Sequence, residues 1–144
     1  MHKIFIYGLL VLATSLFADG IHWAKDYESG IKQATKEKKP VMFVISRHTC
    51  KYCVILEKNT FSDKRVIDKL NKEYVSIISY TDENDYIPRG MYNGSTPMTW
   101  FLNDDGGPMF NPVVGARDPD AYMGALQVVK DRYNEINKKS GKVK

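Results

Sequence analysis

Two cysteines, Cys50 and Cys53, are the residues of this chain whose type and spacing most directly suggest chemistry. They are the only cysteines among 144 residues, and two residues separate them. They follow the apolar run 41–45, which is typical of a strand buried on both faces of a sheet. A Cys-x-x-Cys pair at the junction of such a strand with a helix favours thiol–disulfide exchange, in which one sulfur attacks and the other resolves.

The start of a helix predicts that Cys50 ionises readily. In the first turn, unpaired backbone N–H groups and the positive end of the helix dipole stabilise a thiolate. Arg47, His48 and Lys51 lie close by in the sequence and act in the same direction, although solvent screens exposed charges. We therefore predict a Cys50 pKa below the free value of about 8.5. A stabilised thiolate also raises the reduction potential of the pair.

Two other interpretations of the pair are a structural disulfide and a metal site. A bridge across so short a loop removes little entropy from the unfolded chain, so it is a poor staple. His48 and the two cysteines could supply three zinc ligands, but no second Cys or His pair follows to complete a tetrahedral site. Val54 stands where covalent haem attachment needs histidine. We expect no metal and no other cofactor.

The N-terminus predicts export. A basic start precedes the apolar stretch 4–17, and Ala18 is followed by polar residues, which is the order of regions in a secretory signal. We predict a signal peptide over 1–18 and a single domain over 19–144. Leu16 is larger than the small residue preferred near the cut, so an uncleaved anchor is the alternative, although the apolar stretch is shorter than the roughly twenty residues that span a bilayer. Export implies an oxidising compartment, and we expect the periplasm.

The composition predicts one globular domain. The chain is 43% hydrophobic and 12% aromatic, enough for one core and little more at this length. The formal net charge of +4 comes from lysines spread along the sequence. No motif that reads a nucleic-acid groove accompanies this diffuse charge, so we expect no nucleic-acid partner.

The hydrophobic pattern alternates between helical and strand periods. We predict helices over 26–38, from Cys50 to a break near 59–60, from a cap at Ser62 to about Leu70, and from a cap at Asp118 to about Asn137, with a frayed lysine-rich end. We predict strands over 41–45, 74–80, 95–102 and 109–114, with a loop over 81–94 and a turn at 103–107; Pro112 makes the last strand irregular. This order indicates an α/β domain with a mixed sheet and helices on both faces.

From about Trp23 to Tyr133 the chain resembles the thioredoxin fold. The resemblance rests on Lys39-Pro40-Val41-Met42, on Cys50-Lys51-Tyr52-Cys53 and on Thr96-Pro97. The stretch 56–63 is similar to the periplasmic C-terminal domain of the disulfide reductase DsbD and to small exported proteins related to it. The resemblance implies a four- to five-stranded sheet and thiol–disulfide oxidoreductase activity.

The resemblance also implies roles for single residues. Cys50 matches the attacking cysteine and Cys53 the buried resolving cysteine. Pro97 matches a cis-proline that lies against the pair and leaves the backbone of Thr96 free to bind a partner chain. Tyr52, between the cysteines, is expected to be exposed and to contact the partner.

Two departures from the family pattern concern the proton and the rim of the site. Val44 stands six positions before Cys50, where the family carries a buried acid. Glu57, one turn after Cys53, matches an acidic residue of the DsbD domain and could act instead; the alternative is a solvated helix face. Thr49 replaces the tryptophan of the thioredoxin motif, which makes the rim smaller and more polar.

Together these features predict a periplasmic thiol–disulfide oxidoreductase, with the reducing direction favoured. Its expected partners are proteins with disulfides and an upstream thiol donor in the membrane or periplasm, and we expect a monomer. The competing hypothesis is a thioredoxin-fold binding module or chaperone whose cysteines form only a closed disulfide.

Overall fold

One mixed sheet of four strands organises the part of the chain that this computed structural model describes, residues 20–141. The strand order is β2-β1-β3-β4. Strand β1 (Val41–Ser46) pairs in parallel with β2 (Val75–Tyr80) and antiparallel with β3 (Met98–Leu102), which pairs antiparallel with β4 (Val113–Val114). The signal peptide predicted for 1–18 lies outside the described residues.

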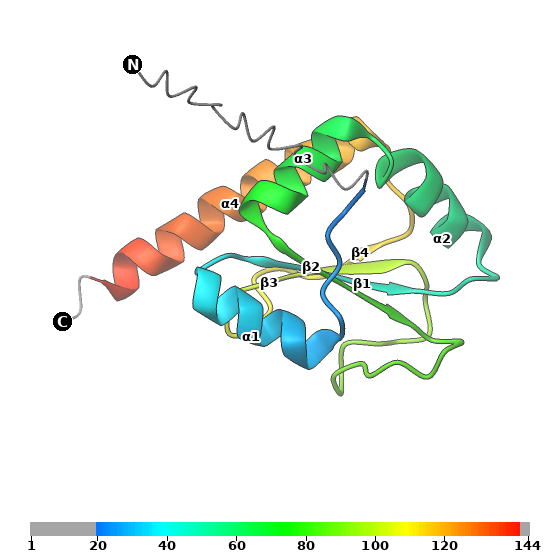
Figure 1. The fold of residues 1–144 in the computed structure, drawn as a ribbon, viewed down its shortest axis with the longest axis horizontal. Helices are drawn as coiled ribbons and strands as arrows, with labels where there is room; N and C mark the ends of the chain where they lie inside the picture. Colours follow the sequence, from blue (N-terminus) through cyan, green and yellow to red (C-terminus); the bar gives the residue numbers. More distant parts are fainter. Residues whose placement is uncertain (1–19, 142–144) are drawn as a thin grey trace, which may run out of the picture.

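Helices cover both faces of the sheet (Figure 1). Helix α1 (Tyr27–Glu37) lies on one face; α2 (Lys51–Ile55), η1 (Leu56–Thr60), α3 (Lys64–Glu73) and α4 (Pro119–Ser140) lie on the other. Alternate residues of β1 fill the two cores: Met42 and Val44 pack with α3 and α4, whereas Phe43 and Ile45 pack with α1. The predicted α/β architecture is confirmed. A single bridge between Trp23 and Ser76 stands at the β2 edge, where a fifth strand would lie.

The polar ends of the helices follow ordinary capping chemistry. Asp26 and Asp118 cap α1 and α4 as predicted, each accepting a hydrogen bond from a backbone N–H of the first turn. The predicted cap at Ser62 is wrong, because Asp63 caps α3 and the Ser62 hydroxyl donates to the Lys58 carbonyl instead. Asp63 can also bond the Arg65 side chain, which favours the carboxylate as the cap.

Further boundaries differ from the sequence prediction. The strand predicted over 95–102 begins only at Met98. The strand predicted over 109–114 shrinks to the two residues of β4, since Pro112 has no N–H to continue the ladder. Helix α4 runs to Ser140 and does not fray at Asn137, whose side chain donates to the Tyr133 carbonyl. Among residues 20–141, no helix is both long and apolar enough to cross a membrane.

Candidate active site

Cys50 lies at the N-terminus of α2, shortly after the C-terminal end of the central strand β1. It is the N-cap residue, and its Sγ accepts a hydrogen bond from the Cys53 backbone N–H at 3.3 Å. The thiol is half-buried and donates to the Thr96 carbonyl at 3.4 Å. The sequence predicted a place in the first turn; the cap position, one residue earlier, directs the sulfur at the free N–H groups of the helix.

Cys53 lies one turn further into the same helix and is fully buried, with 0% of its surface exposed. Both sulfurs are free thiols in this structure. Burial distinguishes them: a partner can reach Cys50 from outside, whereas Cys53 is covered by the helix and the sheet. This arrangement suits a pair in which only one sulfur meets a partner directly.

The surroundings move the two thiol pKa values in opposite directions. Burial raises the pKa of Cys50, but hydrogen bonds from the Cys53 thiol, the Thr96 side chain and the backbone of the helix start outweigh burial and hold this pKa below its ordinary value. Burial raises the pKa of Cys53, and its hydrogen bond with Cys50 adds to the rise. This direction is the one predicted for Cys50, and its main causes are hydrogen bonds rather than flanking cations.

Thr96 and Pro97 form the wall opposite the cysteines. The Thr96–Pro97 peptide bond is cis, and the Thr96 carbonyl faces the Cys50 sulfur. The Pro97 carbonyl accepts a hydrogen bond from Gly115 N–H at 2.8 Å, where φ is +89° and a side chain would be strained. The wall therefore joins the entrance of β3 to the loop that leads into α4.

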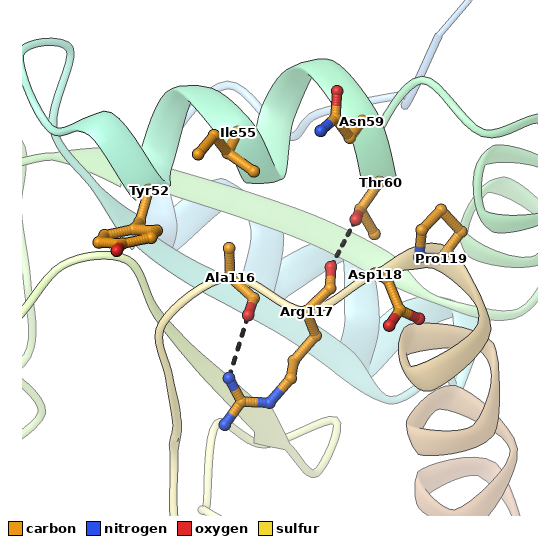
Figure 2. A pocket seen from close by; sticks show the side chains of 8 residues that line it. All are labelled: Tyr52, Ile55, Asn59, Thr60, Ala116, Arg117, Asp118 and Pro119. Carbon is orange, nitrogen blue, oxygen red and sulfur yellow. Dashed lines mark hydrogen bonds between the residues drawn. The ribbon is translucent and has the colours of Figure 1, made fainter.

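Tyr52 stands on the outer rim, with 59% of its surface exposed. Its ring closes one side of a mainly apolar pocket between α2–η1 and the loop before α4 (Figure 2). Ile55 and Ala116 line the middle of this pocket, and Thr60 donates a hydrogen bond to the Arg117 carbonyl at 2.5 Å. This pocket is large enough to take a side chain and lies beside Tyr52.

Glu57 turns inward from η1. Its carboxylate accepts hydrogen bonds from the Ser46 hydroxyl at 3.3 Å and from the Tyr80 hydroxyl. The solvated alternative for Glu57 is therefore wrong. Its helix has widened: the Phe61 N–H bonds to the Leu56 carbonyl, five residues back. Such π-helical turns are frequent at functional sites.

The side chains of the two remaining predicted tuning residues, His48 and Lys51, contact groups other than the sulfurs. His48 stacks on Tyr80 with ring centroids 4.0 Å apart, and its nitrogens contact Asp82 at 3.1 Å and Glu83 at 3.5 Å. Carboxylates therefore compensate any positive charge on this imidazole. Lys51 is exposed, and its Nζ lies 5.9 Å from the centre of the Tyr52 ring.

Sequence reasoning missed Ser46 and Tyr80, which complete the surroundings of Glu57. Each is a polar residue that ends a buried strand, and this shared position was the available signal. Within residues 20–141, no three His, Cys, Asp or Glu side chains come together in a way that could hold a metal ion.

Comparison with known proteins defines first the class and then the family. The fold is similar to a thioredoxin from Thermus thermophilus, with a TM-score of 0.67 at 20% identity over 82% of this chain and 93% of that one. It is also similar to the oxidised Neisseria meningitidis DsbD C-terminal domain, with a TM-score of 0.50 at 16% identity over 69% of this chain and 90% of that one. The protein therefore has the thioredoxin-like fold that its sequence resembles.

Residues 13–144 match the family Thioredox_DsbH, described as "Protein of unknown function, DUF255". The chain belongs to this family. Among curated proteins it is similar to Anterior gradient protein 2-B of Xenopus laevis, with 31% identity over 81 residues, which are 51% of this chain and 49% of the relative. The match thus spans about half the length of that relative.

Proposed function

We propose that this protein is a thiol–disulfide oxidoreductase that works in the periplasm through Cys50 and Cys53. The observation that carries the proposal is the contrast between the two sulfurs. Cys50 is half-buried at a helix N-cap with a lowered pKa, and Cys53 lies one turn inside it, buried and with a raised pKa. A readily ionised sulfur beside a protonated one is what a two-step exchange requires.

The exchange proceeds in two balanced steps. The Cys50 thiolate attacks one sulfur of a partner disulfide, forms a mixed disulfide and releases the other partner sulfur as a thiolate, which takes up a proton. Cys53 then loses its proton and attacks the Cys50 sulfur, so that the Cys50–Cys53 bond forms and the second partner thiolate leaves. The partner is reduced by two electrons and the protein dithiol is oxidised. A thiol donor must return the pair to the dithiol.

The partner binds along the wall of Thr96 and Pro97 and over Tyr52. The Thr96 backbone offers hydrogen bonds to an extended chain, and such strand-like pairing supports affinity without a fixed sequence. The pocket beside Tyr52 accepts a neighbouring apolar side chain of the partner. We expect the working form to be a monomer.

Features of the sequence and the fold similarity support the proposed location and direction. The signal predicted over 1–18 supports export, and the similarity to the DsbD C-terminal domain supports the reducing direction, with electrons supplied by a membrane or periplasmic thiol donor. The lowered pKa of Cys50 acts against a strongly reducing pair, because it stabilises the dithiol. The proposal is therefore a reductase of moderate potential.

Reduction of insulin with a thiol donor tests the proposal. The protein should accelerate insulin reduction, and Cys50→Ser should return the rate to that of the donor alone. Val128→Ala is a matched control, since Val128 is 59% exposed on α4; it should retain full activity. An unaccelerated reaction, or an unchanged rate in Cys50→Ser, would instead indicate the binding module or chaperone.

A further inference from the structure

The loop that leads into α4 is fixed at two points next to the site. At its start, the Gly115 N–H donates a hydrogen bond to the Pro97 carbonyl at 2.8 Å. Two residues later, the Arg117 carbonyl accepts a hydrogen bond from the Thr60 hydroxyl. The loop contributes only backbone groups to these two bonds, so a substitution of the Arg117 side chain keeps both of them.

The Arg117 side chain turns back along this loop, away from α4 (Figure 2). Its Nη1 donates to the Ala116 carbonyl at 3.0 Å, and the same atom lies 3.5 Å from the position that a Cβ at Gly115 would take. The exposed guanidinium therefore lies beside Gly115, whose N–H is bonded to the Pro97 wall. A guanidinium has five N–H donors, and contacts within residues 20–141 occupy one of them.

No carboxylate among residues 20–141 forms an ion pair with Arg117. Other arginines of the chain differ in this respect: Arg65 pairs with two aspartates and Arg132 with a glutamate. The neighbouring acid, Asp118, caps α4 and accepts a hydrogen bond from the Ala121 N–H at 2.8 Å. The charge and the donors of Arg117 are therefore available to a carboxylate of a bound partner.

Two further cations near the site carry the same charge. Arg47 and Lys51 lie on either side of Cys50 in the sequence and are exposed. Neither forms an ion pair within the described part of the chain. The acids that follow β2, Asp82 and Glu83, contact His48 instead. Unpaired positive charge around a binding site attracts a partner of negative charge.

We propose that Arg117 is a specificity-determining residue that binds an acidic side chain next to the disulfide of the partner protein. This inference rests on the proposed function and names its class of partner, a protein whose reactive cysteine has Asp or Glu beside it. The carboxylate accepts two parallel hydrogen bonds from the guanidinium, which adds geometric selectivity to the attraction of charge.

The same loop can separate two side chains of the partner. The Ala116 methyl group points towards α2 and into the pocket beside Tyr52, whereas the Arg117 guanidinium lies on the opposite side of the loop (Figure 2). An extended chain directs successive side chains to opposite sides. A partner bound along the wall therefore places an apolar side chain in the pocket and the neighbouring acidic side chain against Arg117.

Peptides that differ in one residue test the proposal. Each peptide carries one cysteine, joined by a disulfide to 2-thiopyridine, and has Glu, Gln or Lys beside that cysteine, on the N-terminal side in one set and on the C-terminal side in another. Thiopyridine is the better leaving thiol, so Cys50 attacks the peptide sulfur, and absorbance of the released thiopyridone reports the attack. Stopped-flow mixing with the fully reduced chain gives a second-order rate constant for each peptide.

The measured quantity is the ratio of the Glu-peptide rate to the Gln-peptide rate for one protein. This ratio cancels any change in the reactivity of Cys50 between variants. Dividing it by the same ratio for 2-mercaptoethanol removes the intrinsic difference between the peptides. In at least one set, the unsubstituted protein should prefer the Glu peptide by about threefold or more, as for an exposed ion pair. Added salt should reduce this preference.

Substitutions of Arg117 should change the ratio in a set order. Arg117→Gln should remove the preference for the Glu peptide, and Arg117→Glu should reverse it in favour of the Lys peptide. The matched control is Arg132→Gln, which changes another exposed arginine, one that pairs with Glu135 further along α4. This control should keep the preference of the unsubstituted protein.

Equal Glu-peptide and Gln-peptide rates in both sets would overturn the inference, and the proposed function would stand if release is still faster than in Cys50→Ser. Release no faster than in Cys50→Ser would overturn the proposed function itself. A preference that persists in Arg117→Gln would also overturn the inference, and its loss in Lys51→Gln would then assign recognition to that lysine. If Arg117→Glu does not fold, as judged by thermal unfolding, Arg117→Gln decides the inference.

Discussion

The outer and inner sides of α2 present two cysteines in different surroundings. On the outer side Cys50 is half-buried, faces the Thr96 carbonyl and has a lowered pKa. On the inner side Cys53 is fully buried and has a raised pKa. The two sulfurs are one helical turn apart, so hydrogen bonds at the helix start, which lower the pKa of Cys50, and burial, which raises the pKa of Cys53, account for the contrast. A single short helix can thereby assign the attacking and resolving roles.

The largest effect on disulfide exchange should come from replacing each of the two cysteines in turn by serine. Cys50→Ser removes the accessible thiolate, so exchange with a protein disulfide should fall to the uncatalysed rate. Cys53→Ser keeps the attack and removes resolution, so a mixed disulfide with the partner should accumulate. Non-reducing electrophoresis after mixing with a disulfide-containing protein measures both. Equal accumulation of the mixed disulfide in the two variants would contradict the different roles assigned to the outer and inner cysteines.

The next largest effect should be a difference in stability between substitutions on the buried and on the exposed side of this helical segment. Leu56 is 1% exposed beneath the site, and Leu56→Ala should lower the free energy of unfolding by about 2–5 kcal/mol. Tyr52→Ala should change stability by less than about 0.5 kcal/mol, while lowering exchange with protein partners more than exchange with a small disulfide. Urea unfolding and exchange assays measure the two effects. A destabilised Tyr52→Ala would show that its ring contributes to the core.

The pH dependence of attack should show the lowered pKa of Cys50 directly. Attack requires the thiolate, so its rate rises with pH through the Cys50 pKa and then levels off. Because that pKa lies below its ordinary value, the plateau should begin at a lower pH than for an unstructured cysteine. Thiolate absorbance in Cys53→Ala should titrate at a higher pH than in the unsubstituted protein, because Cys50 loses the hydrogen bond from Cys53. An unchanged midpoint would contradict the assigned cause.

The smallest effect should come from the flanking cation. Lys51 is exposed and points towards Tyr52, so Lys51→Ala should move the thiolate titration of Cys50 by about half a pH unit at most. Lys58→Ala, a second exposed lysine of the same helical segment, is the control. A larger shift in Lys51→Ala would mean that the flanking charge, and not hydrogen bonding, is the main cause of the lowered Cys50 pKa.

Local patterns predicted the elements that depend on neighbours in sequence. The apolar run of β1, the Asp118 cap and the buried stripe of Tyr122, Leu126, Val129 and Tyr133 are confirmed. The contacts of Glu57 could not be predicted in the same way, because they join the end of β1, a π-helical turn and the end of β2. The ends of β1 and β2 meet through the parallel register of the sheet, and the π-helical turn reaches them only through tertiary packing.

The contacts of His48 also could not be predicted from its neighbours in the sequence. Its place two residues before Cys50 predicts a charge near the sulfur, yet its ring turns to Tyr80, Asp82 and Glu83, about thirty residues further along the chain. A side chain's electrostatic partners depend on tertiary packing rather than on sequence distance. The prediction from flanking charges therefore had the right direction for Cys50 and the wrong main cause.

The reduction potential of the Cys50–Cys53 pair, measured by equilibration with glutathione, tests the central claim most directly. A working exchange pair should lie between about −270 mV, the value for thioredoxin, and about −120 mV, the value for a strong oxidant. A value nearer the first supports the proposed reducing direction. A value below about −300 mV is that of a structural disulfide and would contradict the account.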